Sequence, residues 1–220
     1  MNFEAQNSSQ TTGQTPDQST PLSEEHVQNL LRESGALMEG HFLLASGRHS
    51  QWYVEKFRLL EQPRVTSQLC TEIARRFADD DIQCVVGPVT GGIILAFEVA
   101  RQLNCRAVYA ERGEGGKGFV FRRGFQLKAG ERVLVVEDIV TTGGSALQVV
   151  QLVEQCGGEV IGVGLLVDRS GGHADFGTSR VEPLLRMNIE TFAPEDAPAE
   201  LTEKFGPAIK PGSSSLQQAF

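Results

Sequence analysis

Apolar residues are spaced in two different ways along this chain. From residue 64 to 78 they recur at every fourth position, as Val65, Leu69, Ile73 and Phe77. This spacing is typical of a helix that buries one face. Later segments, such as 132–136 and 159–167, instead contain runs of adjacent apolar residues, which are typical of strands covered on both faces. The pattern therefore predicts helices that alternate with buried strands.

The order of these elements predicts an α/β fold. Pro21, Ser23 and the acidic residues after them are typical of a helix start. Further helices are predicted over residues 64–78, 93–103 and 145–155. Strands are predicted over residues 41–45, 52–57, 83–86, 106–110, 132–136 and 159–167, and a β-ribbon over 119–121 and 125–127. We expect a parallel sheet flanked by helices, whose ligands bind beyond the carboxyl ends of the strands.

Composition divides the chain into one domain and two tails. Residues 1–20 are rich in Gln, Ser, Thr and Asn, and they lack the charged and apolar regions of a signal peptide. We expect them to form a disordered tail, and residues 196–220 to form an irregular C-terminal tail. The domain is predicted over residues 21–195, with a small N-terminal hood at about 21–60 and a core at about 61–195.

The chain carries 28 acidic and 20 basic residues, which gives a net charge of −8. This balance argues against a general nucleic-acid binder, whose phosphate-facing surface is basic. No apolar stretch approaches the ~18–20 residues of a membrane span. The four histidines and four cysteines show no metal-ligand spacing. We therefore expect a cytoplasmic protein without a metal site of its own, with cysteines that serve as small buried residues: Cys70, Cys84, Cys105 and Cys156.

Glycine is concentrated in the middle of the chain, with 18 of the 24 glycines between Gly87 and Gly177. Such a concentration predicts tight backbone loops. One loop, 113–118, matches the G-x-G-x-x-G pattern of dinucleotide-binding proteins, but the residues after it, FVFRRGF, are aromatic and β-like. Because that pattern binds pyrophosphate at the start of a helix, we do not expect a dinucleotide site here.

Residues 133–145, VLVVEDIVTTGGS, carry the strongest chemical signal. A buried strand ends at two adjacent carboxylates, Glu137 and Asp138, and a Thr-Thr-Gly-Gly-Ser turn opens the next helix. Small residues and hydroxyls at a helix start bind phosphate through backbone N–H groups without lysine. Carboxylates at a strand end accept hydrogen bonds from sugar hydroxyls, or stabilise positive charge that develops nearby. Together these features indicate a site for a ribose phosphate.

The segment VLVVEDIVTTGGSA resembles the phosphoribosyl-diphosphate (PRPP) motif of type I phosphoribosyltransferases. Three further segments are similar to elements of the orotate phosphoribosyltransferases: HFLLASGRHSQWY at 41–53, GPVTGGIILA at 87–96 and Val-Asp-Arg at 167–169. The four segments occur in that family's order, and the resemblance covers about residues 22–192. The short segment 111–118 is similar to the branch of the family with a short catalytic loop.

The resemblance implies transfer of 5-phosphoribosyl from PRPP to orotate, which yields orotidine 5′-monophosphate and pyrophosphate in pyrimidine (UMP) biosynthesis. It also implies a type I phosphoribosyltransferase fold, a homodimer, and Mg²⁺ that is carried by PRPP. The displacement passes through an oxocarbenium-like state, and it needs no nucleophilic side chain because orotate supplies the nitrogen. The protein has to align the reactants and neutralise the leaving pyrophosphate.

Each matching segment implies a role in binding. The turn 141–145 would hold the 5′-phosphate, and the two adjacent carboxylates would face the ribose hydroxyls. Thr141 and Arg169 would border the orotate, and residues 90–92 would approach the pyrophosphate through backbone N–H groups. The PRPP-binding residues are then Glu137, Asp138, Ile139, Val140, Thr141, Thr142, Gly143, Gly144, Ser145, Thr90, Gly91 and Gly92.

The chain departs from the family on the pyrophosphate side. Many relatives carry a lysine where Ala45 and Gly91 stand here, and a histidine in a longer catalytic loop. Besides Glu137 and Asp138, our candidate catalytic residues are Arg112 and Lys117, on a mobile lid that closes over the ligand. Two further basic residues follow behind them: Arg122 and Arg123.

Two other functions stay open at this point. The PRPP motif alone also fits a phosphoribosyltransferase for another base, such as a purine or uracil. It further fits a non-catalytic regulator that senses PRPP and binds nucleic acid, which would need a DNA-binding helical domain or a basic face. SGRHS at 46–50 and Arg169 favour orotate. Arg48 and His49 belong either to a dimer or substrate contact, or to a polar turn between strands.

Overall fold

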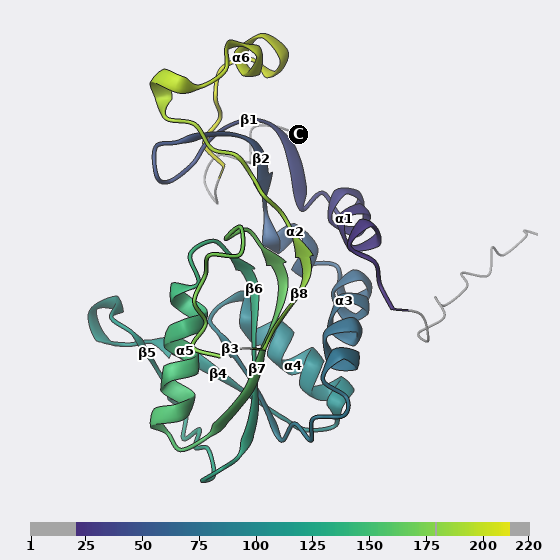
Figure 1. Cartoon of the computed structure of the whole chain (residues 1–220), viewed down its shortest axis with the longest axis vertical. Coiled ribbons are helices and arrows are strands. Elements are labelled where there is room, and N and C mark those ends of the chain that lie inside the picture. Colours follow the sequence, from purple (N-terminus) through teal and green to yellow (C-terminus); the bar gives the residue numbers. More distant parts are fainter. Residues whose placement is uncertain (1–20, 179, 212–220) are drawn as a thin grey trace, which may run out of the picture.

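A computed structural model of the chain describes residues 21–178 and 180–211. Its core is a six-stranded sheet in the order β5-β4-β3-β6-β7-β8 (Figure 1). The strands are β3 (Cys84–Pro88), β4 (Arg106–Arg112), β5 (Phe119–Val120), β6 (Arg132–Val140), β7 (Glu159–Asp168) and β8 (Val181–Arg186). Neighbouring strands are parallel except β4 and β5, which are antiparallel. The predicted parallel sheet flanked by helices is confirmed.

Helices cover both faces of this sheet (Figure 1). They are α3 (Pro63–Arg76) and α4 (Gly91–Leu103) on one face, and α5 (Gly144–Gln155) on the other. Strand β6 packs against both layers. Leu134 and Val136 are buried in the cluster that contains α3 and α4, whereas Val133 and Val135 are buried in the cluster that contains α5. A strand covered on both sides needs adjacent apolar residues, which explains the run in the sequence.

A smaller layer, which we call the hood, lies mostly beyond one end of the six-stranded sheet (Figure 1). Its elements are α1 (Glu24–Glu33), β1 (Leu37–Leu43), β2 (His49–Val54), α2 (Lys56–Leu60) and α6 (Ala199–Phe205). β1 and β2 form an antiparallel pair. The predicted helix start is confirmed, because the Ser23 side chain accepts a hydrogen bond from the backbone N–H of His26 at 3.2 Å and so caps α1.

The described part of the predicted irregular tail at 196–220, residues 196–211, is ordered. It contains α6, and Ile209 then joins the edge of β1. The backbone N–H of Leu43 donates to the Ile209 carbonyl at 2.8 Å, and the N–H of Ile209 donates to the His41 carbonyl at 2.9 Å. Local patterns could not reveal this pairing of distant segments. Residues 1–20 and 212–220, which fall in the two predicted tails, lie outside the described residues.

Two strand predictions in the core were wrong. Residues 125–127 form no strand, and β5 pairs with the end of β4 instead, so the predicted ribbon has a different partner. Strand β8 was not predicted, because Glu182 and Pro183 interrupt its apolar pattern. An edge strand tolerates such residues, since only one side of its backbone is paired.

Two boundaries near the predicted ligand site also differ from the prediction. β6 continues to Val140, so Glu137 and Asp138 lie inside the strand rather than beginning a loop, and Glu137 pairs with Leu165 of β7. In the hood, the predicted strand over 52–57 divides: β2 ends at Val54 and α2 begins at Lys56. Both shifts change which side chains reach the ligand site.

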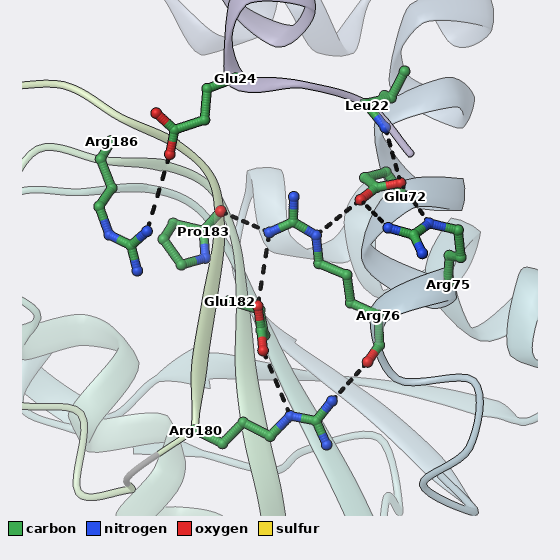
Figure 2. A network of polar contacts seen from close by, with 9 residues as sticks. All are labelled: Leu22, Glu24, Glu72, Arg75, Arg76, Arg180, Glu182, Pro183 and Arg186. Atoms are coloured by element: carbon green, nitrogen blue, oxygen red, sulfur yellow. Dashed lines mark hydrogen bonds and ion pairs between the residues drawn. The ribbon is translucent and has the colours of Figure 1, made fainter. Parts of the chain in front are cut away.

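An ionic network fastens the hood and α3 to the edge of the sheet (Figure 2). Its centre is Glu72, which is 3% exposed and accepts hydrogen bonds from Arg75, from Arg76 and from the backbone N–H of Leu22. Arg76 also donates to the Pro183 carbonyl of β8 at 2.9 Å. Burial alone raises the pKa of Glu72, but the arginine hydrogen bonds outweigh it and leave the pKa below its usual value.

The cysteines differ in exposure. Cys70 and Cys84 are buried, Cys105 is half-buried and Cys156 is exposed, and all four are free thiols. The expectation of burial is therefore wrong for Cys156, which caps the end of α5. Within residues 21–178 and 180–211, none of the helices has both the length and the apolar character needed to cross a membrane.

Candidate active site

A cavity of about 180 Å³ opens where β6 ends and α5 begins. Residues from the core sheet, from the start of α5 and from the hood line it: Lys56, Pro88, Val89, Arg112, Phe119, Glu137, Asp138, Ile139, Val140, Thr141, Thr142, Gly143, Gly144, Ser145 and Ala146. All nine predicted PRPP-binding residues from 137 to 145 are thus brought together at the carboxyl end of a parallel strand, where α/β sheets bind their ligands.

The turn before α5 has the backbone of a phosphate site. Gly143 has a φ of +82°, and a Cβ there would lie 2.9 Å from the Cβ of Ala174, so both backbone conformation and space require glycine. The first backbone N–H groups of the twelve-residue helix α5 follow directly. Thr141 and Thr142 expose their side chains beside them. This arrangement suits a phosphate group.

The two carboxylates behind this turn are almost fully buried. Glu137 is 7% exposed and Asp138 is 2% exposed. Burial, and secondly the neighbouring charge of Asp138, raise the pKa of Glu137 to about 8. Glu137 therefore carries a proton at neutral pH and can donate a hydrogen bond to a ribose oxygen. Oδ1 of Asp138 accepts a hydrogen bond from the backbone N–H of Ile139 at 2.7 Å.

Lys56 joins this pair from the hood, and no pattern in the sequence indicated that it would. Its Nζ atom donates to Oδ1 of Asp138 at 3.1 Å and lies 2.8 Å from Oδ2. The sequence predicted that Lys56 lies inside a strand over 52–57, whereas it begins α2. The start and the direction of α2 depend on how the hood packs, so local sequence could not place this side chain at the cavity. The contact also fixes the position of α2 over the end of β6.

The predicted pyrophosphate loop lies behind the acid pair. Thr90 occupies the N-cap position of α4 without a side-chain capping hydrogen bond, and Gly91 and Gly92 begin the helix, outside the cavity lining. A Cβ on Gly91 would lie 2.0 Å from Oδ2 of Asp138, and one on Gly87 would lie 2.2 Å from the carbonyl oxygen of Gly92. These glycines are required because the end of β3, the start of α4 and the acid pair approach one another closely.

Of the predicted lid residues, Arg112 lies at the cavity and Lys117 does not line it. Nη2 of Arg112 donates to Ser145 Oγ at 3.2 Å, and its guanidinium lies 4.1 Å from the centre of the Phe119 ring. Lys117 is exposed in the turn between β4 and β5, and Arg122 is exposed beyond it. Arg123 is 3.0 Å from Glu111 and therefore has an anionic partner of its own.

Arg169 follows β7, beside the end of β6. Its backbone N–H donates to the Val140 carbonyl at 2.7 Å. Its Nε atom is buried and has no hydrogen-bond partner in the described part of the chain, and burial lowers the pKa of the guanidinium. A buried donor without a partner is costly, so this group is suited to an anionic ligand. Arg169 does not line the cavity itself.

Arg48 and His49 contact protein rather than the cavity. Arg48 Nε donates to Thr191 Oγ1 at 2.8 Å. Nδ1 of His49 lies 2.7 Å from Nε2 of His41, whose Nδ1 lies 3.0 Å from the Gly206 carbonyl. Arg48 thus links the turn between β1 and β2 to Thr191, and His49 supports the contact of His41 with the end of α6.

The residues from 59 to 176 match the family model of the phosphoribosyl transferase domain. The chain is 45% identical over 184 residues to the orotate phosphoribosyltransferase of Caldicellulosiruptor bescii, covering 84% of this chain and 94% of that protein. The chain belongs to the orotate phosphoribosyltransferase family. Another member, from Thermotoga maritima, is 46% identical over 191 residues, 87% of this chain and all of that protein.

Solved structures of the family have the same architecture. The orotate phosphoribosyltransferase of Aeropyrum pernix superposes with a TM-score of 0.62 at 26% identity, covering 81% of this chain and 97% of that one. The Mycobacterium tuberculosis orotate phosphoribosyltransferase gives a TM-score of 0.61 at 27% identity, over 74% and 96% of the two chains. An adenine phosphoribosyltransferase at 19% identity and a TM-score of 0.55 shares the fold.

Proposed function

We propose that this chain transfers 5-phosphoribosyl from PRPP to orotate and so catalyses a step of pyrimidine biosynthesis. The observation that carries the proposal is the cavity at the end of β6, where a phosphate-binding turn and a buried acid pair meet. The chain is also about 45% identical to proteins named for this activity over most of its length.

The cavity suggests how the substrate is held. The 5′-phosphate would lie against the backbone N–H groups of residues 141–145, with Arg112 beside Ser145 to offset its charge. Glu137 and Asp138 would hold the ribose hydroxyls, and the carboxylate of Asp138 would face the positive charge that develops at C1′. The C1′–O bond breaks and its electron pair leaves with the diphosphate, while a ring nitrogen of orotate forms the new C1′–N bond and releases its proton to solvent.

Arg169 and Thr141 are our candidates for the orotate contact. The unpartnered Nε of Arg169 would donate to the anionic base, and Thr141 exposes a hydroxyl beside the same end of β6. Mg²⁺ would enter as part of the PRPP complex. No group of three or more His, Cys, Asp or Glu side chains suited to a metal occurs in residues 21–178 and 180–211.

We further propose a homodimer in the cytoplasm. Large apolar side chains are exposed on α2 and α4, which pack against each other: Phe57 is 47% exposed, Ile94 40% and Phe97 65%. Burying such residues against a second copy would be favourable. The four free thiols suit a reducing compartment.

Incubation of the purified protein with PRPP, Mg²⁺ and orotate tests the proposal, with orotidine 5′-monophosphate and pyrophosphate as the measured products. We expect Asp138→Asn to lower turnover by about a hundredfold or more, because the buried charge beside C1′ is lost. Asp79→Asn, at an exposed position after α3, is the matched control and should leave turnover unchanged.

The same assay separates the competing functions. Consumption of a purine or uracil without consumption of orotate would overturn the substrate assignment. A protein that consumes no base, but retards nucleic acid in a mobility-shift assay at physiological salt, would instead be a regulator. Removal of Mg²⁺ by a chelator should abolish orotate consumption, and added Mg²⁺ should restore it.

A further inference from the structure

The mechanism above leaves Lys56 without a role, although it lines the cavity. Its side chain extends from the start of α2 in the hood to the end of β6, where it meets the carboxylate of Asp138. The side chain of Lys56 is 33% exposed, against 3% for that of Asp138. The ammonium group thus lies at the open side of a buried carboxylate, where a ligand can reach it.

Positive charge in the cavity comes from two side chains at different places. Among the described residues that line the cavity, the cationic ones are Lys56 and Arg112. Arg112 contacts Ser145, at the 5′-phosphate turn, whereas Lys56 contacts Asp138, at the acid pair. PRPP carries its two anionic groups on opposite sides of the ribose. With the 5′-phosphate at the turn and the ribose at the acid pair, the diphosphate extends to the end that holds Lys56.

The first turn of α4 cannot bring a side chain to this end. A Cβ on Gly91 would lie 2.0 Å from Oδ2 of Asp138 and 3.0 Å from Cδ1 of Leu60 in α2. Lys117, the sequence-based candidate for a pyrophosphate contact, does not line the cavity. Among the described residues, it is therefore Lys56 of the hood that places a cationic side chain at the diphosphate end of the cavity.

We propose that Lys56 binds the diphosphate of PRPP, and that it leaves Asp138 for the diphosphate when the substrate enters. This inference rests on the proposed function. The exchange would release Asp138 to accept a hydrogen bond from a ribose hydroxyl. Oδ2 of Asp138 can accept such a hydrogen bond. It is a buried oxygen that accepts none among the described residues, and its contact with Lys56 is an ion pair without hydrogen-bond geometry.

The exchange also gives Lys56 a part in the chemical step. As the C1′–O bond breaks, negative charge grows on the leaving diphosphate oxygen, and the Lys56 ammonium would stabilise it. Lys56 transfers no proton in this step, because the diphosphate leaves as an anion. Asp138 already holds the ammonium group at the cavity, so only the Lys56 side chain has to move when the substrate arrives.

Ligand binding by Lys56→Met tests the inference without relying on turnover. Affinities for PRPP, inorganic diphosphate and ribose 5-phosphate, each with Mg²⁺, would be measured by calorimetry. We expect Lys56→Met to weaken PRPP and diphosphate binding by about tenfold or more. Ribose 5-phosphate lacks the diphosphate, so its affinity should change by less than about twofold. Lys56→Arg should restore most of the PRPP affinity, because it keeps the charge.

Lys204→Met is the matched control, because Lys204 forms its ion pair with Glu39 in the hood and should leave all three affinities unchanged. Unchanged PRPP binding by Lys56→Met, or an equal loss for all three ligands, would overturn the inference and leave Lys56 a structural partner of Asp138. If Lys56→Met fails to fold, Lys56→Gln makes the same comparison with a hydrogen-bond donor kept for Asp138. Failure of the wild-type protein to convert orotate would refute the proposed function instead.

Discussion

Close packing and burial restrict which residue types can stand in and beside the cavity. Gly91 is confined by the carboxylate of Asp138, and Gly143 by Ala174 and a positive φ. Glu137 is enclosed so fully that its pKa rises to about 8. Such burial lowers the stability of the fold, because an ionisable side chain is kept away from water.

We expect Glu137→Gln to stabilise the protein at alkaline pH. The unfolded chain loses this proton near the ordinary pKa of 4.5, whereas the folded chain keeps it to about pH 8. Between these values the folded state binds more protons, so wild-type stability falls as the pH rises. The variant does not titrate there, and its Tm should exceed that of the wild type by about 3 °C or more at pH 8.5.

Thermal unfolding at pH values from 4.5 to 9 measures this effect. The gap between the two proteins should close toward pH 4.5. Glu154→Gln, at an exposed position on α5, controls for the loss of one negative charge. Parallel pH curves for the wild type and Glu137→Gln would contradict the raised pKa.

At the scale of elements, polar contacts hold α3 and the hood helix α1 against β8, the edge strand of the sheet. α3 reaches β8 through Arg76, and α1 reaches β8 through an ion pair of Glu24 with Arg186 at 3.9 Å (Figure 2). Glu72 is the buried member of this network. Its neighbours Arg75 and Arg76 are 42% and 21% exposed, so solvent weakens part of the attraction.

We expect Glu72→Gln to lower the free energy of unfolding by about 1–3 kcal/mol at pH 7, because a buried acceptor of charged hydrogen bonds is lost. The lowered pKa of Glu72 means that its contribution is present above the ordinary pKa of 4.5 and is lost as the pH falls through the folded value. The difference from the wild type should therefore shrink in acid.

Chemical denaturation at pH 7 and pH 3.5 measures the change. Glu159→Gln is the control: Glu159 is 58% exposed and pairs with Arg132, so its loss should have little effect. A Glu72→Gln variant as stable as the wild type at pH 7 would show that the network adds nothing to the fold.

At the scale of the whole molecule, an acidic chain has to bind a polyanion. The net charge of −8 argues against a broad basic surface. Backbone N–H groups of the turn before α5 and two cationic side chains of the cavity offer local positive potential instead. Lys117 lies on an exposed turn outside the cavity, a position that suits a contact made across the dimer that we propose.

We expect mixed dimers to reveal such a shared site. Lys117→Ala should lower turnover by about tenfold or more, and Asp138→Asn should be nearly inactive. If Lys117 acts in the neighbouring site, half of the dimers in an equal mixture contain one complete site. Activity should then recover to about a quarter of the wild-type value. Turnover of the mixture is compared with that of each variant alone.

No recovery in subunits shown to exchange would place Lys117 in the site of its own subunit. Full activity of Lys117→Ala by itself would remove Lys117 from the mechanism. Analytical ultracentrifugation of the wild-type protein is the control, because a shared site requires that the protein be a dimer in solution.

Local sequence determined much of the fold and one half of the site. Apolar runs gave β6 and β7, because a strand between two helix layers must be apolar on both faces. Residues 137–145 follow one another along the chain, so their chemistry could be recognised without knowing the fold. The glycine clusters likewise marked the close approaches around this segment.

Tertiary structure alone decided the contacts between distant segments. Lys56 meets Asp138 only because α2 packs over the end of β6, and the pairing of Ile209 with β1 depends on the return of the chain to the hood. The same holds for β8, whose polar residues are stabilised by α3. Local patterns show which face of a helix or strand is buried. Contacts such as that of Lys56 with Asp138 join residues far apart in the sequence, so their free energy depends on how the whole chain folds.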